Sequence, residues 1–177
     1  MPDDHAVLIE RDGRHVLRFE RLLDHPRERV WRALTEADEL QAWHPTPFRL
    51  EPRSGGTVAF LPSPGVPEMG SGRVLACEKP SLLVHSWGED ELRWTLEQRG
   101  DGCLLALEHS FADRLKAARD GAGWHICLIA LAARVDGREV PDRGSAQRLP
   151  GGWSELNAEY LQRFGITAEE ATPIPQM

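Results

Sequence analysis

Two histidines are the side chains best suited to acid–base chemistry in this chain. His109 shares strand parity with Leu107 and Phe111, so its ring is expected to point into the core. His125 follows Trp124 and is expected in the first turn of a long apolar helix. Histidine titrates near neutral pH, so either ring is a candidate general acid or base, or a group that orients a ligand. The competing interpretation is structural, with His109 bonded to backbone in the core and His125 partly exposed.

Metal binding has little support in the sequence pattern. Metal sites need three or four converging ligands, and the candidate residues show no HxH or HxxxH spacing. Strand parity also places Glu108 on the face opposite His109. The sequence therefore predicts no metal site and no cofactor. The candidates considered are His85, His109, His125 and Glu108.

Nucleophilic catalysis and nucleotide binding are not indicated either. The chain has no GxSxG motif, and Ser86 and Ser110 have no evident base at a defined spacing. Cys127 lies inside an apolar stretch, where burial keeps a thiol unreactive. The glycines form neither a GxGxxG nor a Walker motif.

The aromatic residues point to ligand binding. Tryptophan supplies six aromatic side chains, beside five phenylalanines and one tyrosine. Large rings stack on small molecules, but they also fill ordinary cores, and both interpretations stay open. We predict a ligand pocket with the walls Trp43, Phe60, Trp87, Trp94, His109, Trp124, His125 and Leu128.

Length, charge and cysteine content limit the class of protein. A chain of 177 residues favours one domain with a sizeable core. A net charge of −7 argues against nucleic-acid binding, which depends on neutralising phosphates. Without a CxxC pair, Cys77, Cys103 and Cys127 are expected to be buried reduced thiols. No apolar signal segment and no run of membrane-spanning length occur, so a cytoplasmic protein is expected.

The order of the expected elements defines an α+β chain. Residues 15–23 alternate as a strand, and two short helices follow this first strand. Residues 48–111 alternate between tight turns, which predicts an antiparallel meander. A long apolar helix containing 124–135 then precedes a polar loop at 138–152 and a last helix at 153–164.

This order predicts a curved antiparallel sheet of about six or seven strands wrapped around a long C-terminal α-helix. We expect a single domain over residues 15–165, with an N-terminal extension at 1–14, a loop insertion at 138–152 and a C-terminal tail at 166–177. A helix that is apolar nearly all round must be covered on more than one side. The sheet is expected to cover one side, and the loop, the last helix or a second subunit to cover the other.

Several short motifs occur in an order that is known from one family. The segment PRERVWRALTEADELQAW contains a VW-x-A-L-T motif in the expected helix pair. The GG pair at 55–56 precedes a strand, GRV at 72–74 and DG at 101–102 begin two more, and GWH at 123–125 begins the long helix. In order and spacing these motifs resemble the SRPBCC superfamily (START/Bet v 1-like, helix-grip). Within it they are most similar to the branch named for the activator of Hsp90 ATPase homologue 1.

The resemblance covers roughly residues 15–165 and implies the helix-grip fold. Superfamily members bind lipids, hormones and polyketides, and some are cyclases or aromatases. The resemblance thus implies a small apolar or amphipathic ligand in a hydrophobic cavity between the sheet and the C-terminal helix.

Two alternative functions stay open beside simple ligand binding. The first is an enzyme of the cyclase, dehydratase or hydrolase type that uses His109 or His125 as general acid or base. The second is a module that contacts an Hsp90-type chaperone. Assembly into a homodimer stays open as well. The chain has Ala42-Trp43 where the branch often has a Trp-Trp pair. Because about 14 residues precede the first expected strand, the separate N-terminal domain of eukaryotic Hsp90 activators is not expected.

Overall fold

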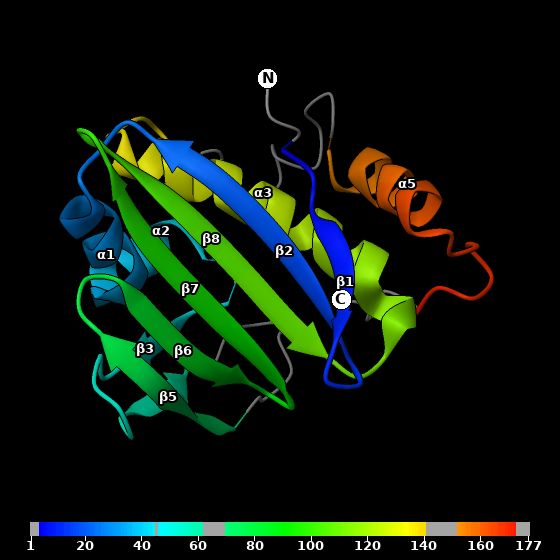
Figure 1. Cartoon of the computed structure of the whole chain (residues 1–177), viewed down its shortest axis with the longest axis horizontal. Coiled ribbons are helices and arrows are strands. Elements are labelled where there is room, and N and C mark those ends of the chain that lie inside the picture. The colour runs from blue at the N-terminus through cyan, green and yellow to red at the C-terminus, as the bar shows by residue number, and fades with distance from the viewer. Residues whose placement is uncertain (1–3, 45, 62–69, 141–151, 173–177) are drawn as a thin grey trace.

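The computed structural model describes residues 4–44, 46–61, 70–140 and 152–172. Eight strands form one antiparallel sheet in the order β1-β2-β8-β7-β6-β5-β4-β3. Figure 1 shows this sheet curving across the long helix α3 (Ala117–Val135), with α1 and α2 near one end and α5 beside α3. The expected α+β class, with a curved antiparallel sheet around a long helix, is therefore confirmed.

The remaining elements have the following bounds. The strands are β1 (Val7–Arg11), β2 (Arg14–Leu23), β3 (Phe48–Leu50), β4 (Thr57–Phe60), β5 (Ser71–Glu78), β6 (Leu82–Trp87), β7 (Asp90–Arg99) and β8 (Gly102–Phe111). Beside α3, the helices of the described segments are α1 (Arg27–Thr35), α2 (Ala37–Trp43), the 3-10 helix η1 (Arg114–Lys116) and α5 (Trp153–Phe164).

The strand count is higher than the sequence predicted. The additional strand β1 lies within residues 1–14, which were expected to be an extension, so the two short helices follow the second strand rather than the first. β1 turns into β2 through Asp12 and Gly13, whose φ angles of 53° and 73° are both positive, as in a type I′ hairpin turn. Alternation misses this strand because its residues are exposed or half-buried. The Asp-Gly pair is the signal that predicts it.

Helix α3 begins earlier than expected. It starts at Ala117, so Trp124 and His125 lie well inside the helix and His125 is not in the first turn. The error comes from Gly121 and Gly123, because glycine disfavours helix interiors. A Cβ atom on Gly121 would lie 3.3 Å from Cγ of Tyr160 on α5. Gly121 therefore serves the close approach of the two helices.

Two different layers cover α3. The sheet lies on one side, and α5 packs on another through the contact between Gly121 and Tyr160 (Figure 1). The last helix is thus one of the elements that cover α3, whereas most of the predicted loop at 138–152 lies outside the described residues. Within the described segments, no helix combines the length and apolar character needed to cross a membrane.

The cysteines follow the prediction in part. Cys103 and Cys127 are buried free thiols, and Cys77 is also free but only half-buried. Burial raises the pKa of Cys103 to about 11, which keeps this thiol protonated at neutral pH.

Candidate functional site

Aromatic side chains from the sheet, α2 and α3 gather into one group of touching rings. Five predicted pocket residues belong to it: Trp43, Phe60, Trp87, Trp94 and Trp124. Three further rings complete it: His44, Phe48 and His85. We call these eight side chains the aromatic cluster.

The rings of the aromatic cluster are packed against one another. The centroids of Trp94 and Trp124 are 5.7 Å apart, those of Trp43 and Trp94 6.0 Å, and those of His44 and Trp124 5.6 Å. The interplanar angles of these pairs are 79°, 79° and 70°, which is the edge-to-face arrangement that aromatic quadrupoles favour. The inner part of the cluster therefore serves as core.

Exposure is uneven along the cluster. Trp43, Trp94 and Trp124 are 4%, 2% and 6% exposed, whereas Phe60 and Trp87 are half-buried. The rings of Phe60 and Trp87 contact each other at 5.0 Å between centroids. One end of the cluster is thus accessible to solvent and the other is closed.

Strand parity and helix ends place these rings. On β6, His85 and Trp87 fall on the same face, and on β7 Trp94 pairs with Leu83 of β6. Trp43 is the last residue of α2, and its indole Nε1 donates a hydrogen bond to the carbonyl of Ala33 on α1 at 2.8 Å. The last turn of α2 is therefore fixed to α1 and directs Trp43 at the sheet.

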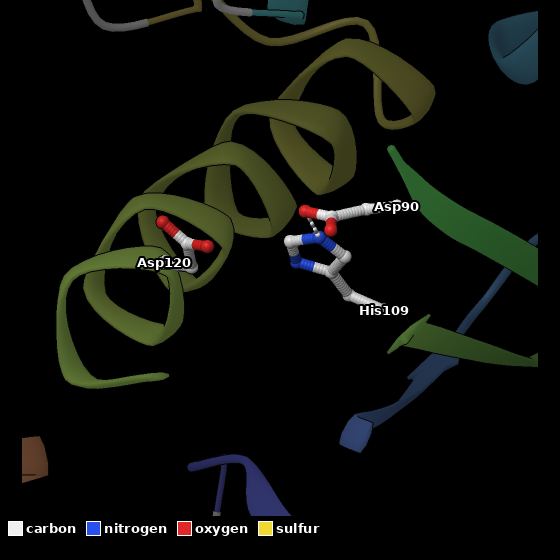
Figure 2. A group of neighbouring side chains, drawn as sticks. All are labelled: Asp90, His109 and Asp120. Atoms are coloured by element: carbon white, nitrogen blue, oxygen red, sulfur yellow. Dashed lines mark hydrogen bonds and ion pairs between the residues drawn. The ribbon is translucent and has the colours of Figure 1, made fainter. Parts of the chain in front are cut away.

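His109 lies at the edge of the cluster, between a tryptophan and a carboxylate. The indole Nε1 of Trp124 donates to Nδ1 of His109 at 3.1 Å. Nε2 of His109 lies 2.9 Å from Oδ2 of Asp90, as Figure 2 shows. An indole N–H can only donate, so Nδ1 carries the lone pair and the proton of the neutral ring sits on Nε2, facing Asp90. Both ring nitrogens are engaged by protein groups, and neither is offered to a third group in this arrangement.

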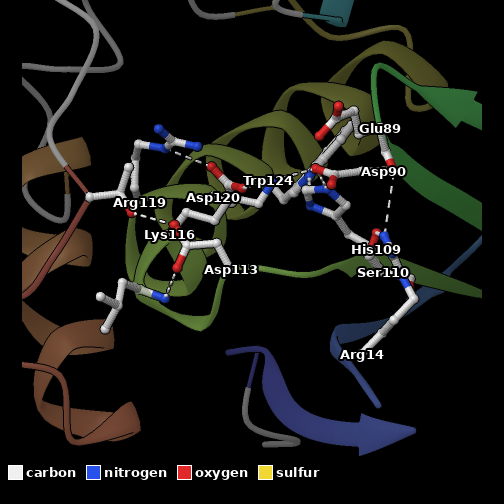
Figure 3. A network of polar contacts seen from close by, with 12 residues as sticks. Arg14, Glu89, Asp90, His109, Ser110, Asp113, Lys116, Arg119, Asp120 and Trp124 are labelled. Atoms are coloured by element: carbon white, nitrogen blue, oxygen red, sulfur yellow. Dashed lines mark hydrogen bonds and ion pairs between the residues drawn. The ribbon is translucent and has the colours of Figure 1, made fainter. Parts of the chain in front are cut away.

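Further charges extend from Asp90 to the start of α3. The ammonium of Lys116 lies 2.5 Å from Oδ2 of Asp90 and 4.0 Å from Oδ2 of Asp120, and Nε of Arg119 lies 2.8 Å from Oδ1 of Asp120 (Figure 3). Burial tends to raise the pKa of Asp90, but the hydrogen bonds from His109 and Lys116 outweigh it and hold that pKa below its ordinary value. Asp90 is therefore a carboxylate at neutral pH.

The same group is the one set of metal-ligand types that converges in the described residues. Ligand atoms of Asp90, His109 and Asp120 lie within 4.8 Å of one another (Figure 2). Two features disfavour a metal ion there. The ammonium of Lys116 already contacts Asp90. A metal on Nε2 of His109 would also require a proton on Nδ1, where Trp124 already donates one.

The other metal candidates are placed elsewhere. His85 is buried in the aromatic cluster. Glu108 accepts hydrogen bonds from Arg11 and Arg18 on the face opposite His109, as strand parity predicted. These two residues and His125 do not converge with His109 on one point.

His125 faces away from the predicted pocket. Its Nδ1 lies 3.0 Å from the hydroxyl of Tyr160 on α5, and that hydroxyl accepts a hydrogen bond from the backbone N–H of Ala6 at 2.9 Å. The ring of His5 packs against the ring of His125, with 5.0 Å between the two centroids. Burial, helped by the nearby positive charge of Arg21, lowers the pKa of His125 to about 4. His125 is thus a neutral ring between α3, α5 and the N-terminal segment.

Several residues of the site were not predicted. His85 is 1% exposed, its Nδ1 donates to the carbonyl of Ser86 at 3.1 Å, and burial lowers its pKa to about 4. Asp90 is the first residue of β7, directly after the turn that follows β6, and it was not singled out in the sequence. Lys116 and Asp120 had a sequence signal, because opposite charges four residues apart face one another on a helix. That signal was missed since the helix was expected to begin later.

These features define the class of protein. The sheet that curves around α3, with two short helices between its second and third strands, is a helix-grip architecture whose interior is aromatic. The sequence model of the family described as "Activator of Hsp90 ATPase homolog 1-like protein" matches residues 24–136, which is more than half of the chain. The chain therefore belongs to this family.

Solved structures share the fold. CalU16 from Micromonospora echinospora is 24% identical, with a TM-score of 0.70 over 90% of this chain and 97% of CalU16. EF2215 from Enterococcus faecalis, a conserved protein of unknown function, is 22% identical with a TM-score of 0.70 over 90% of each chain. A Bordetella parapertussis protein encoded by BPP1335 is 27% identical with a TM-score of 0.62, covering 93% of this chain and 90% of that one. A comparison with curated proteins found no match.

Proposed function

We propose that this protein binds a small apolar or amphipathic molecule at the half-buried end of the aromatic cluster. The observation that carries the proposal is the exposure of Phe60 and Trp87, which lead directly to the buried rings of Trp94 and Trp124. A ligand there would gain about 25 cal/mol for each Å² of apolar surface removed from water, before the costs of ordering it. Membership of a family with a ligand-binding type of fold supports the same class of function.

The packing of the cluster suggests how the ligand enters. Because the interior rings already touch, the ligand separates Phe60 from Trp87 instead of filling a ready-made space. Flat apolar molecules fit such a site best, since they replace one edge-to-face contact with another. An amphipathic molecule would keep its polar group toward solvent at this end.

The alternatives have less support in the geometry. Both nitrogens of His109 are engaged, and His125 lies against α5, so neither ring presents a free nitrogen to the aromatic cluster. Contact with an Hsp90-type chaperone, a homodimer, the cytoplasmic location and the domain limits stay predictions from the sequence.

Titration with the uncharged fluorophore N-phenyl-1-naphthylamine tests the proposal. We expect saturable binding, seen as increased dye emission and as a complex in native mass spectrometry, and at least roughly tenfold weaker binding in Trp87→Ala, because truncating an aromatic anchor removes most of its contact energy. Trp153→Ala is the matched control, since Trp153 is also half-buried but belongs to α5. No saturable binding, or equal loss in the two variants, would contradict the proposal.

A further inference from the structure

Trp124 connects the two parts of the site. Its ring packs against Trp87, Trp94 and His44 in the aromatic cluster. Its indole N–H is bonded to His109, which belongs to the charged network around Asp90. Any change that breaks the bond between Trp124 and His109 therefore acts directly on a ring of the proposed ligand site.

The bond between Trp124 and His109 exists for only one protonation state of the imidazole. In the neutral ring, Nδ1 accepts the indole proton while Nε2–H faces Asp90 at 2.9 Å. Protonation at Nδ1 turns this nitrogen into a donor that faces another donor. Two N–H groups cannot bond to each other, so the indole must leave and one buried N–H loses its partner.

The charges around His109 balance while its ring is neutral. Asp90 of β7 and Asp120 of α3 are the acidic groups, and Lys116 of η1 and Arg119 of α3 are the basic ones. Asp90 favours a positive ring, but Lys116 already bonds the same Oδ2 atom that His109 contacts. The residues paired with His109 on the two neighbouring strands, Leu17 of β2 and Leu92 of β7, are uncharged.

The imidazole of His109 also contacts the ring of Phe111, two residues further along β8 on the same face. Phe111 on β8 packs against His109 at 5.1 Å between centroids, and the ammonium of Lys116 lies 5.3 Å from the centre of the Phe111 ring. The side chain of His109 is only 3% exposed. The imidazole therefore cannot turn into solvent to escape the conflict with Trp124.

We propose that His109 is a positioning residue whose protonation controls Trp124. Neutral His109, oriented by Asp90, holds the indole in the aromatic cluster, and protonated His109 releases it. The consequence for ligand affinity rests on the function proposed above. The coupling between His109 and Trp124 does not, because it needs only the protein itself.

The coupling is tested first without ligand. The indole ¹H–¹⁵N resonance of Trp124, assigned with Trp124→Phe, is followed across a pH series in which the ring resonances of His109 are read from the same samples. We expect it to shift in one step together with the His109 ring. In His109→Gln it should stay constant, since glutamine accepts from Trp124 and donates to Asp90 but does not titrate. A Trp124 resonance that ignores the His109 step, or that moves equally in His109→Gln, overturns the proposal.

The second measurement is the affinity for N-phenyl-1-naphthylamine at two pH values, one above and one below the pH at which the first experiment finds His109 to change charge. We expect the wild type to bind roughly five- to tenfold more weakly at the lower pH, the scale of one hydrogen bond. His109→Gln and Trp124→Phe should show no such difference, and thermal melts confirm that each variant is folded. Dye binding that is equal at both pH values overturns the proposed control and leaves ligand binding intact. A titrating indole without any dye binding supports the coupling and contradicts the proposed function.

Discussion

The two sides of α3 are formed by neighbouring residues and yet have different chemistry. Trp124 faces the sheet, where aromatic rings meet a charged network and one end is half-buried. His125 faces α5, where Gly121 and Tyr160 bring two helices together. Consecutive helix residues point about 100° apart, so a Trp-His pair in a helix is not one site. The sheet side of α3 is suited to binding a ligand, and the α5 side is suited to tight helix packing that closes the core.

The histidines on the two sides show what decides their roles. His109 has a carboxylate on one nitrogen and an N–H donor on the other, so protonation has a direct structural consequence. His125 is desolvated and lies near Arg21 and His5, which lowers its pKa to about 4 and keeps it neutral. Residue type alone suggested the same acid–base chemistry for both histidines. Their roles differ because the groups around each ring differ.

The largest expected effect is the loss of stability when the α5 side is opened. Tyr160 is fully buried, and its hydroxyl bonds Ala6 and His125. We expect Tyr160→Ala to lower the free energy of unfolding by about 4 kcal/mol, as large-to-small changes of buried aromatics do. Chemical denaturation measures it.

The matched variants sharpen this contrast between the sides. Tyr160→Phe should cost about 1 kcal/mol, because it keeps the ring and leaves the N–H of Ala6 without its acceptor. Trp87→Ala should cost clearly less stability than Tyr160→Ala, since Trp87 is half-buried. If Trp87→Ala proves the more damaging to stability, the division into a binding side and a closing side is wrong.

An intermediate effect on the free energy of unfolding is expected from pH. Each side of α3 has one buried histidine that contributes to it, His85 on the sheet side and His125 on the α5 side. The pKa of His85 and that of His125 are both lowered from 6.5 to about 4 by burial. Between these values the unfolded chain binds protons that the folded chain does not. Stability is therefore complete above about pH 6.5 and falls as the pH drops toward 4, by on the order of 2 kcal/mol for each ring.

Denaturation curves at a series of pH values test this dependence. His85→Asn and His125→Asn should each remove part of the slope between about pH 6.5 and pH 4, because asparagine does not titrate. A wild-type stability that is flat over this range would show that neither ring is held neutral by the fold.

The sequence predicted the larger elements and failed at their ends. Alternation along 102–111 placed His109 inward and Glu108 outward, and both positions are confirmed. Five of the eight rings of the aromatic cluster were predicted as pocket walls, four of them tryptophans, whereas His44, Phe48 and His85 were not. Asp90 was not predicted, since its role depends on pairing between β7 and β8, which brings residues far apart in sequence together. The start of α3 was misplaced because intrinsic propensity was given more weight than helix packing.

The smallest effect concerns the two glycines that caused this error. A Cβ atom on Gly123 meets nothing within 4 Å, so Gly123→Ala should stabilise the protein by about 0.5–1 kcal/mol through helix propensity. A Cβ atom on Gly121 lies 3.3 Å from Tyr160, whose hydroxyl is held by Ala6 and His125 and whose ring therefore yields poorly. We expect Gly121→Ala to be less stable than Gly123→Ala by about 1 kcal/mol or more, as overpacking predicts. Equal melting temperatures for the two variants would mean that α5 can shift away from α3, and that the closing side is looser than the contact with Tyr160 implies.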